Sequence, residues 1–238
     1  MTRAALKWLA EGDPAIRWQT ERDLLDRNPR TWRSTRGAVA TEGWGKQLLD
    51  EQDPGGTWGN GLYTPKWTST TYTLLLLRRL GLPSSNERAV AGSRRLFDDA
   101  DWCHGGVSYW ASRAYAERCV NGMVLAISSH FDGTDRRADS VAELLVGVAM
   151  RDGGWNCQDV RGATHSSFHT TISVLEGLLE WKRSTDSSDA DAAIARGREF
   201  LLEHRMYRSH RTGEVINDAW TTFHFPPRWH YDVLRGLD

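Results

Sequence analysis

The sequence predicts an all-α protein built from repeated helix pairs, and three observations lead to that prediction. No segment shows sustained alternation of apolar and polar residues, whereas spacings of three and four between apolar residues are frequent. A glycine-containing loop, usually with tryptophan, recurs about every fifty residues, a period typical of stacked supersecondary units. Helices with charged faces alternate with helices almost free of charge, which is typical of two concentric layers. We therefore expect an α/α toroid, a partial (α/α) barrel of about four to six helix pairs.

The loops of the repeat set its register. Copies follow one another at Gly55-Gly56-Thr57-Trp58, at Gly105-Gly106 and at Gly153-Gly154-Trp155, with a degenerate copy at Gly213. Each loop leads into a polar helix start and then into an apolar run. The helix starts carry residues of different chemistry at a spacing of fifty: Ser69, Cys119 and His169.

The helices follow from apolar spacing and from their end signals. Asp13-Pro14 provides a cap and a first-turn proline for a second N-terminal helix, and Gly81-Leu82-Pro83 ends a later one. Residues 1–42 form N-terminal helices, and the repeats occupy 43–238 of a single domain. The expected helices cover residues 4–9, 16–24, 43–51, 69–80, 88–97, 120–131, 137–150, 171–182, 189–204 and 228–237.

The end of the chain falls inside an expected inner helix, and only about four helix pairs are visible in the repeats. Either the N-terminal helices close the ring or the toroid is incomplete at its C-terminus. An open edge would expose apolar helix faces, which would favour oligomerisation.

Composition excludes several classes of partner. The formal net charge of −1 offers no basic field for nucleic acid or for anionic lipid. Three cysteines, an odd number, argue against a disulfide framework and favour a reducing, cytoplasmic location. The longest apolar stretch, residues 144–150, is too short to cross a bilayer, and the N-terminus lacks the apolar core of a signal peptide.

One loop carries a family resemblance. Gln52-Asp53-Pro54-Gly55-Gly56-Thr57-Trp58 resembles the Gln-x-x-x-Gly-x-Trp motif of squalene-hopene and oxidosqualene cyclases, whose repeat superfamily includes the β-subunits of protein prenyltransferases. Residues 196–201 resemble the lead-in to the same motif, and the resemblance covers roughly residues 43–238. It implies an α/α toroid in which tryptophan and glutamine tie an outer helix to the following loop.

The acid motifs of terpene cyclases are absent. Class II cyclases protonate their substrate with the central acid of an Asp-x-Asp-Asp motif, and the nearest run, Asp98-Asp99-Ala100-Asp101, has the wrong order. No Asp-Asp-x-x-Asp segment is present to hold magnesium. A standard class II squalene cyclase is therefore excluded.

Two helix starts resemble the zinc site of protein prenyltransferases. Glu117-Arg118-Cys119 and Phe168-His169-Thr170 match its acid-x-Cys and aromatic-His-Thr segments, with glutamate in place of the family's aspartate. The resemblance implies zinc held by Cys119, His169 and Glu117. Cys157, Asp159 or His165 could replace Glu117 as a ligand. The structural alternative is that Cys119 is a small buried hydrophobe and His169 caps a helix.

Titratable groups gather at one expected rim, which favours an enzyme acting on a small amphiphilic or isoprenoid-like molecule. The alternative is a non-catalytic toroid that binds a lipid-like or peptide ligand, since aromatic side chains serve both purposes. The candidate catalytic residues are His169, Cys119, His165 and Asp159. The candidate substrate-binding residues are Trp67, Thr70, Tyr72, Phe168 and Trp229.

Overall fold

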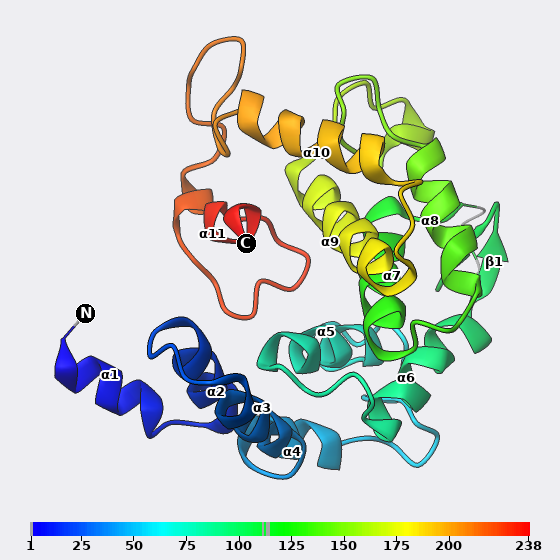
Figure 1. The fold of residues 1–238 in the computed structure, drawn as a ribbon. Helices are drawn as coiled ribbons and strands as arrows, with labels where there is room; N and C mark the ends of the chain where they lie inside the picture. Colours follow the sequence, from blue (N-terminus) through cyan, green and yellow to red (C-terminus); the bar gives the residue numbers. More distant parts are fainter. Residues whose placement is uncertain (1, 111, 113–114) are drawn as a thin grey trace. The chain divides into compact units, whose positions relative to one another are not determined.

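The computed structural model describes residues 2–110, 112 and 115–238 and is mostly helical, which confirms the all-α prediction (Figure 1). The chain forms two compact units, residues 1–95 and 96–238. No helix in the described part of the chain is long and apolar enough to cross a membrane. The toroid, like the single domain, stays a prediction.

The helices lie close to their expected positions. The first unit contains α1 (Arg3–Ala10), α2 (Pro14–Asp23), α3 (Pro29–Gly37), the 3₁₀ helix η1 (Ala38–Ala40), α4 (Gly43–Asp50), α5 (Thr70–Leu80) and most of α6 (Glu87–Asp98). The second unit contains β1 (Asp101–Cys103), β2 (Gly106–Ser108), α7 (Arg118–Phe131), α8 (Arg137–Gly147), η2 (Asp159–Arg161), α9 (Phe168–Thr185), α10 (Asp191–Glu203), η3 (Asp218–Thr221) and α11 (Val233–Leu237).

The first unit confirms the end signals of its helices. The Asp13 carboxylate accepts hydrogen bonds from the backbone N–H groups of Ala15 at 2.9 Å and Trp44 at 2.8 Å, so it caps α2 and holds α4. Gly81 ends α5 with φ of +90°, and an added Cβ would lie 2.5 Å from the Trp18 ring. Only glycine fits this turn, because the turn needs both the left-handed backbone and the space.

The Trp58 loop is fixed from both sides. The backbone N–H of Trp58 donates to the hydroxyl of Thr70 at 3.0 Å, and the indole N–H donates to the carbonyl of Leu48 at 2.7 Å. The Gln52 side chain donates to the carbonyls of Gly56 and Arg88. Tryptophan and glutamine therefore tie helix to loop in the expected way.

The second unit is built around α7 and α9, which lie side by side and are parallel (Figure 1). A Cβ on Gly122 would lie 2.5 Å from the Ser173 carbonyl oxygen, and one on Gly177 would lie 2.4 Å from that of Gly122. Glycine therefore allows the two backbones to approach closely. His130 of α7 contacts Glu180 of α9 at 2.9 Å, so the two helices keep the same direction. α8 packs against α7, and α10 packs against α9.

Hydrogen bonds define the repeat more sharply than the sequence pattern does. The N–H of Trp155 donates to the Thr171 hydroxyl at 3.0 Å, and the N–H of Val107 donates to the Asn121 side chain at 2.8 Å. Thr70, Asn121 and Thr171 are therefore equivalent anchors. Cys119 and His169 each precede their anchor by two residues, so they share a position. Their counterpart in the first repeat is Thr68, one residue before the expected Ser69.

Three elements differ from the expected ones. α3 is an additional helix, begun by Asn28, whose side chain accepts from the N–H of Thr31. Residues 101–108 form a short hairpin, β1–β2, rather than a loop. The helix expected over 228–237 is confined to α11, because Asp232 caps it by accepting from the N–H of Arg235 at 2.8 Å.

Candidate functional site

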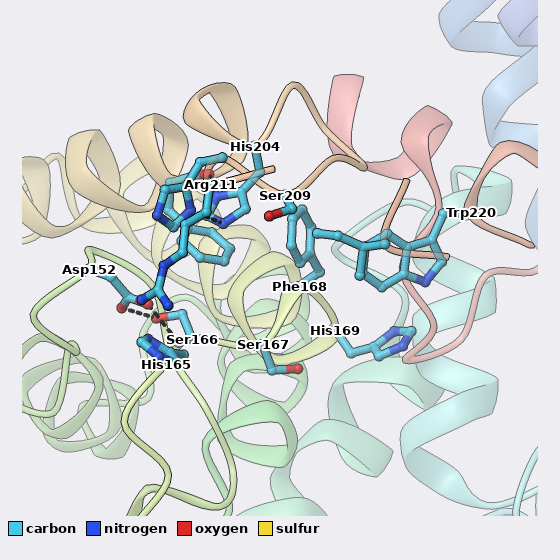
Figure 2. Close-up of a pocket in the computed structure, with 13 residues that line it drawn as sticks. Asp152, His165, Ser166, Ser167, Phe168, His169, His204, Ser209, Arg211 and Trp220 are labelled. Carbon is cyan, nitrogen blue, oxygen red and sulfur yellow. Dashed lines mark hydrogen bonds between the residues drawn. The ribbon is translucent and has the colours of Figure 1, made fainter. Parts of the chain in front are cut away.

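A pocket of about 380 Å³ opens beside the N-terminal end of α9, within the second unit (Figure 2). Four histidines, one acid, one arginine and several aromatic rings line it. Figure 2 shows His169 and Trp220 on one side of Phe168, with His204, Arg211 and Asp152 on the other side. The lining residues are Asp152, His165, Ser166, Ser167, Phe168, His169, Phe200, His204, Ser209, His210, Arg211, Ile216 and Trp220.

Two of the histidines form a directed pair. His204 follows the end of α10, and its Nδ1 lies 2.7 Å from the carbonyl oxygen of Phe200. A carbonyl only accepts, so this Nδ1 carries the proton, and the Nε2 of the neutral ring is an acceptor. His210 Nδ1 lies 2.9 Å from that Nε2 and is the donor. The Nε2 of His210 is then left with a lone pair.

His169 is a neutral donor in this site. The backbone N–H of Tyr231 donates to its Nδ1 at 2.7 Å, so the ring proton lies on Nε2. The pKa of His169 is lowered to about 4. Burial is the largest cause, and the nearby charges of His230 and Arg235 act in the same direction. At neutral pH the ring therefore presents Nε2–H, and it cannot act as a cation.

Trp220 and Phe168 form the apolar wall of the pocket. Their ring centroids are 4.6 Å apart, and His169 meets Trp220 edge-on at 5.8 Å. The Nε1 of Trp220 is buried and has no hydrogen-bond partner among the described residues. A buried indole N–H usually has a partner, so this atom is a donor suited to an acceptor on a ligand or to a water molecule.

Asp152 fixes the loop that carries His165. Its carboxylate accepts from both the N–H and the hydroxyl of Ser166, at 2.8 and 2.5 Å. The His165 carbonyl accepts from the Asn156 side chain at 2.7 Å, so the loop is tied at two neighbouring residues. The imidazole of His165 remains exposed at the pocket wall.

Two thiols lie beside the pocket, between the starts of α7 and α9. The backbone N–H of Cys119 donates to Cys157 Sγ at 3.1 Å, and the Thr170 hydroxyl donates to the same sulfur at 3.5 Å. Interaction with the Cys119 thiol lowers the pKa of Cys157 to about 7, and the same interaction raises the pKa of Cys119. Burial opposes the first shift and adds to the second.

Asp159 serves as an ionic anchor for the thiol loop. Arg118 pairs with its carboxylate at 2.9 Å and also donates to the carbonyl of Ala116 at 2.7 Å. Arg118 precedes Cys119, and Asp159 lies two residues after Cys157. The ion pair therefore holds the loop of one cysteine against the helix of the other.

The remaining predicted site residues are divided between the units. Trp67, Thr70 and Tyr72 belong to the first unit, where Trp67 packs against Tyr72 at 4.9 Å and Thr70 is the loop anchor. Trp229 belongs to the second unit and packs edge-on against His169 at 5.2 Å. Phe168 alone of the predicted substrate-binding residues lines the pocket.

The predicted zinc ligands do not converge. Cys119 and Cys157 are neighbours, but His169 Nδ1 is taken by Tyr231, and Glu117 begins α7 without capping it by its side chain. Among the described residues, no three His, Cys, Asp or Glu side chains are placed to hold a metal ion together. Zinc sites in proteins have three or four protein ligands, and the two adjoining cysteines alone fall short of that number. Zinc binding stays a prediction, which elemental analysis of the purified protein would test.

The sequence patterns did not predict three of the pocket residues, His204, His210 and Trp220. His204 is the last residue of an expected helix, and His210 and Trp220 follow in a segment without periodicity. The only sequence signal is a cluster of histidine and arginine, His204-Arg205 and Ser209-His210-Arg211, directly after a helix. Comparisons with protein-family models, curated proteins and solved structures find no match to this chain.

Proposed function

We propose that the protein is an enzyme that performs acid–base chemistry on a small amphiphilic molecule bound in the histidine pocket. The observation that carries the proposal is the directed pair of His204 and His210, which leaves a lone pair on His210 Nε2. Imidazole is the general base that enzymes use most often. A base oriented by a second group, itself held by a backbone carbonyl, is the arrangement expected of a catalytic site.

His210 accepts the proton of the substrate or of an attacking water on Nε2 and becomes a cation. Its Nδ1–H keeps donating to His204, whose Nδ1–H remains on the Phe200 carbonyl. The pair thus holds the imidazole in one orientation and stabilises the positive charge that develops on it. Return of the same proton to the leaving group completes the cycle.

The other pocket groups suit the two ends of an amphiphile. Phe168, Trp220 and Ile216 provide apolar contact for its hydrophobic part. His169 Nε2–H is a donor for an oxygen on its polar part. Preorganised donors of this kind stabilise negative charge that develops on oxygen.

We also propose that the chain belongs to the α/α-toroid superfamily of squalene cyclases and prenyltransferases. Support comes from the parallel helices α7 and α9, from the Gln52 and Trp58 contacts, and from the repeated anchors. The reaction itself is proposed from the pocket alone, because a fold does not determine chemistry.

The test combines a binding probe with turnover. Anilinonaphthalene sulfonate, an anionic amphiphile, is bound first and then displaced by a panel of fatty-acyl esters, isoprenoid alcohols and isoprenoid diphosphates. Mass spectrometry follows the conversion of every compound that displaces it. We expect His210→Asn to lower kcat by about 10²–10⁴-fold without changing affinity for the probe. His104→Asn, an exposed histidine outside the pocket lining, is the matched control.

Ligands that bind but are converted neither by the wild type nor by any variant would favour the alternative, a non-catalytic pocket for an amphiphile. Equal turnover in His210→Asn and in His104→Asn would contradict the assignment of His210 as the base.

A further inference from the structure

The cysteine pair beside the pocket is not used by the acid–base proposal. Cys119 lies in the first turn of α7, and Cys157 lies in the loop that precedes η2. Neither forms a disulfide in this structure, and both residues are half-buried. The backbone N–H of Cys119 donates to Cys157 Sγ at 3.1 Å, so the two residues adjoin.

The two sulfur atoms have different surroundings. Cys157 Sγ accepts from the N–H of Cys119 at 3.1 Å and from the hydroxyl of Thr170 at 3.5 Å. These donors belong to the first turns of two parallel helices, whose N-terminal ends carry partial positive charge. The Cys119 thiol adjoins this sulfur, and its own pKa is raised by interaction with Cys157 and by burial. Cys157 is therefore the sulfur prepared to carry negative charge.

The pair is also held ready to close. Arg118 and Asp159 join the two backbone segments through their ion pair, and the N–H of Cys157 lies 3.4 Å from the Thr170 hydroxyl. A disulfide needs an S–S length of about 2.05 Å and neighbouring Cβ atoms. Cys157 Sγ already lies 3.1 Å from the backbone nitrogen of Cys119, so the two side chains are neighbours.

We propose that Cys157 and Cys119 form a redox-active dithiol, in which Cys157 attacks a low-molecular-weight disulfide and Cys119 resolves the product. In the first step the Cys157 thiolate attacks one sulfur of R–S–S–R. The S–S bond breaks, R–S⁻ leaves with the electron pair and takes up a proton, and Cys157 becomes a mixed disulfide.

In the second step Cys119 loses its proton and its sulfur attacks the sulfur of Cys157. A second R–S⁻ leaves and is protonated, and the Cys119–Cys157 disulfide remains. Two protein thiols are oxidised by two electrons, and one small disulfide is reduced to two thiols. The negative charge on Cys157 is lost in the first step, so it no longer opposes deprotonation of Cys119.

Glutathione disulfide is the probe, and intact-mass and peptide-mass analysis are the readouts. The wild type is expected to lose two hydrogens and to retain no glutathione, with the new bond between Cys119 and Cys157. Cys119→Ser is expected to retain one glutathione on Cys157. Cys157→Ser is expected to react at Cys119 at least about tenfold more slowly, because the prepared thiolate is gone. Cys103→Ser, which removes the hairpin cysteine, should behave as the wild type does.

A second measurement needs no variant. Brief treatment of the wild type with iodoacetamide, followed by peptide mapping, should label Cys157 at least about tenfold faster than Cys103. Equal labelling of the two, or a wild type that stays fully reduced in glutathione disulfide, would overturn the proposal. Neither readout involves the histidine pocket, so failure here leaves the acid–base proposal to its own test.

Discussion

The Trp58 loop of the first unit and the Trp155 loop of the second are held by the same contacts. In each, the backbone N–H of tryptophan donates to a threonine hydroxyl at 3.0 Å, and the indole donates to a leucine carbonyl ten residues earlier at 2.7 Å. In each, a glycine lies against the indole ring: Gly92 in the first unit and Gly197 in the second.

The difference lies in what surrounds the anchor. In the first unit, the hydroxyls of Thr70 and Thr71 donate to the carbonyls of Gly61 and Leu62, so polar groups close the loop upon itself. In the second unit, the equivalent region carries Cys157 and His169. Cys157 Sγ accepts from the N–H of Cys119, and His169 Nδ1 accepts from the N–H of Tyr231, so neither atom closes the loop upon itself. The same anchoring contacts therefore support a loop closed by its own hydrogen bonds in one copy and the candidate site in the other.

The largest expected effect is on stability when either tryptophan is removed. Trp58 and Trp155 are 2% and 0% exposed, so Trp58→Ala and Trp155→Ala should each lower the free energy of unfolding by about 3–5 kcal/mol. Urea denaturation measures both. Trp8→Ala, at a site 74% exposed, should change it by less than about 0.5 kcal/mol. If one buried tryptophan costs no more than this control, the two loops are not equivalent.

The glycines behind the indoles should be the next most sensitive positions. A Cβ at Gly92 or Gly197 would lie 2.6 or 2.8 Å from the Cζ3 atom of its tryptophan. Gly92→Ala and Gly197→Ala should therefore each cost about 1–3 kcal/mol through overpacking. Gly147→Ala is the control, since nothing lies within 4 Å of its added Cβ, and helix propensity predicts stabilisation there. Stabilisation at Gly92 or Gly197 would argue against the shared packing.

The threonine anchors provide a test of similar or smaller size. Thr70→Val and Thr171→Val keep the shape of the side chain but leave the buried N–H of Trp58 or Trp155 without an acceptor. Each should cost about 1–3 kcal/mol. Thr→Ser at the same positions retains the hydroxyl and should restore most of the loss. A valine that is tolerated in only one unit would separate the two loops.

The smallest expected effect is a pH dependence of the free energy of unfolding, which arises from His169 at the start of α9. His169 has a pKa of about 4, below its ordinary value of 6.5, so between these pH values the unfolded chain binds a proton that the folded chain does not. Stability should therefore fall as pH falls through this window, and His169 should contribute no further loss below about 4. Because the ring is half-exposed, its share is about 1–2 kcal/mol.

Urea denaturation across this window measures the effect in the wild type and in His169→Asn, which keeps an acceptor for the Tyr231 N–H. The variant should lose less stability than the wild type on acidification. An identical pH dependence of the two proteins would contradict the burial of a neutral His169.

The sequence allowed much of the scaffold to be predicted. Glycine, proline and apolar spacing gave most helices, since these signals act within a few residues. The Gly-Trp loops gave the repeat, and both tryptophans pack as the motif implies. The sequence aligned Ser69 with Cys119 and His169, one residue away from the true counterpart, because loop lengths differ between copies. The hydrogen bonds to Thr70, Asn121 and Thr171 show the structural alignment.

The site was predicted only in part. His165, His169 and Phe168 line the pocket, and Cys119 adjoins Cys157, which the sequence offered as an alternative metal ligand. The pair of His204 and His210 depends on the turn that follows α10 and on a backbone carbonyl, neither of which leaves a periodic signal. Tertiary contacts of this kind are set by the folded chain rather than by local sequence.

The proposed catalytic role depends most directly on where the protons of the histidine pair lie. Nitrogen-15 NMR of the imidazole rings at neutral pH assigns the tautomer of each. We predict that His204 and His210 are both protonated on Nδ1, so that Nε2 of His210 is the available base. His210 protonated on Nε2 alone, or a doubly protonated His204, would contradict this prediction, because the lone pair of His210 would then lie on Nδ1 and be occupied by His204.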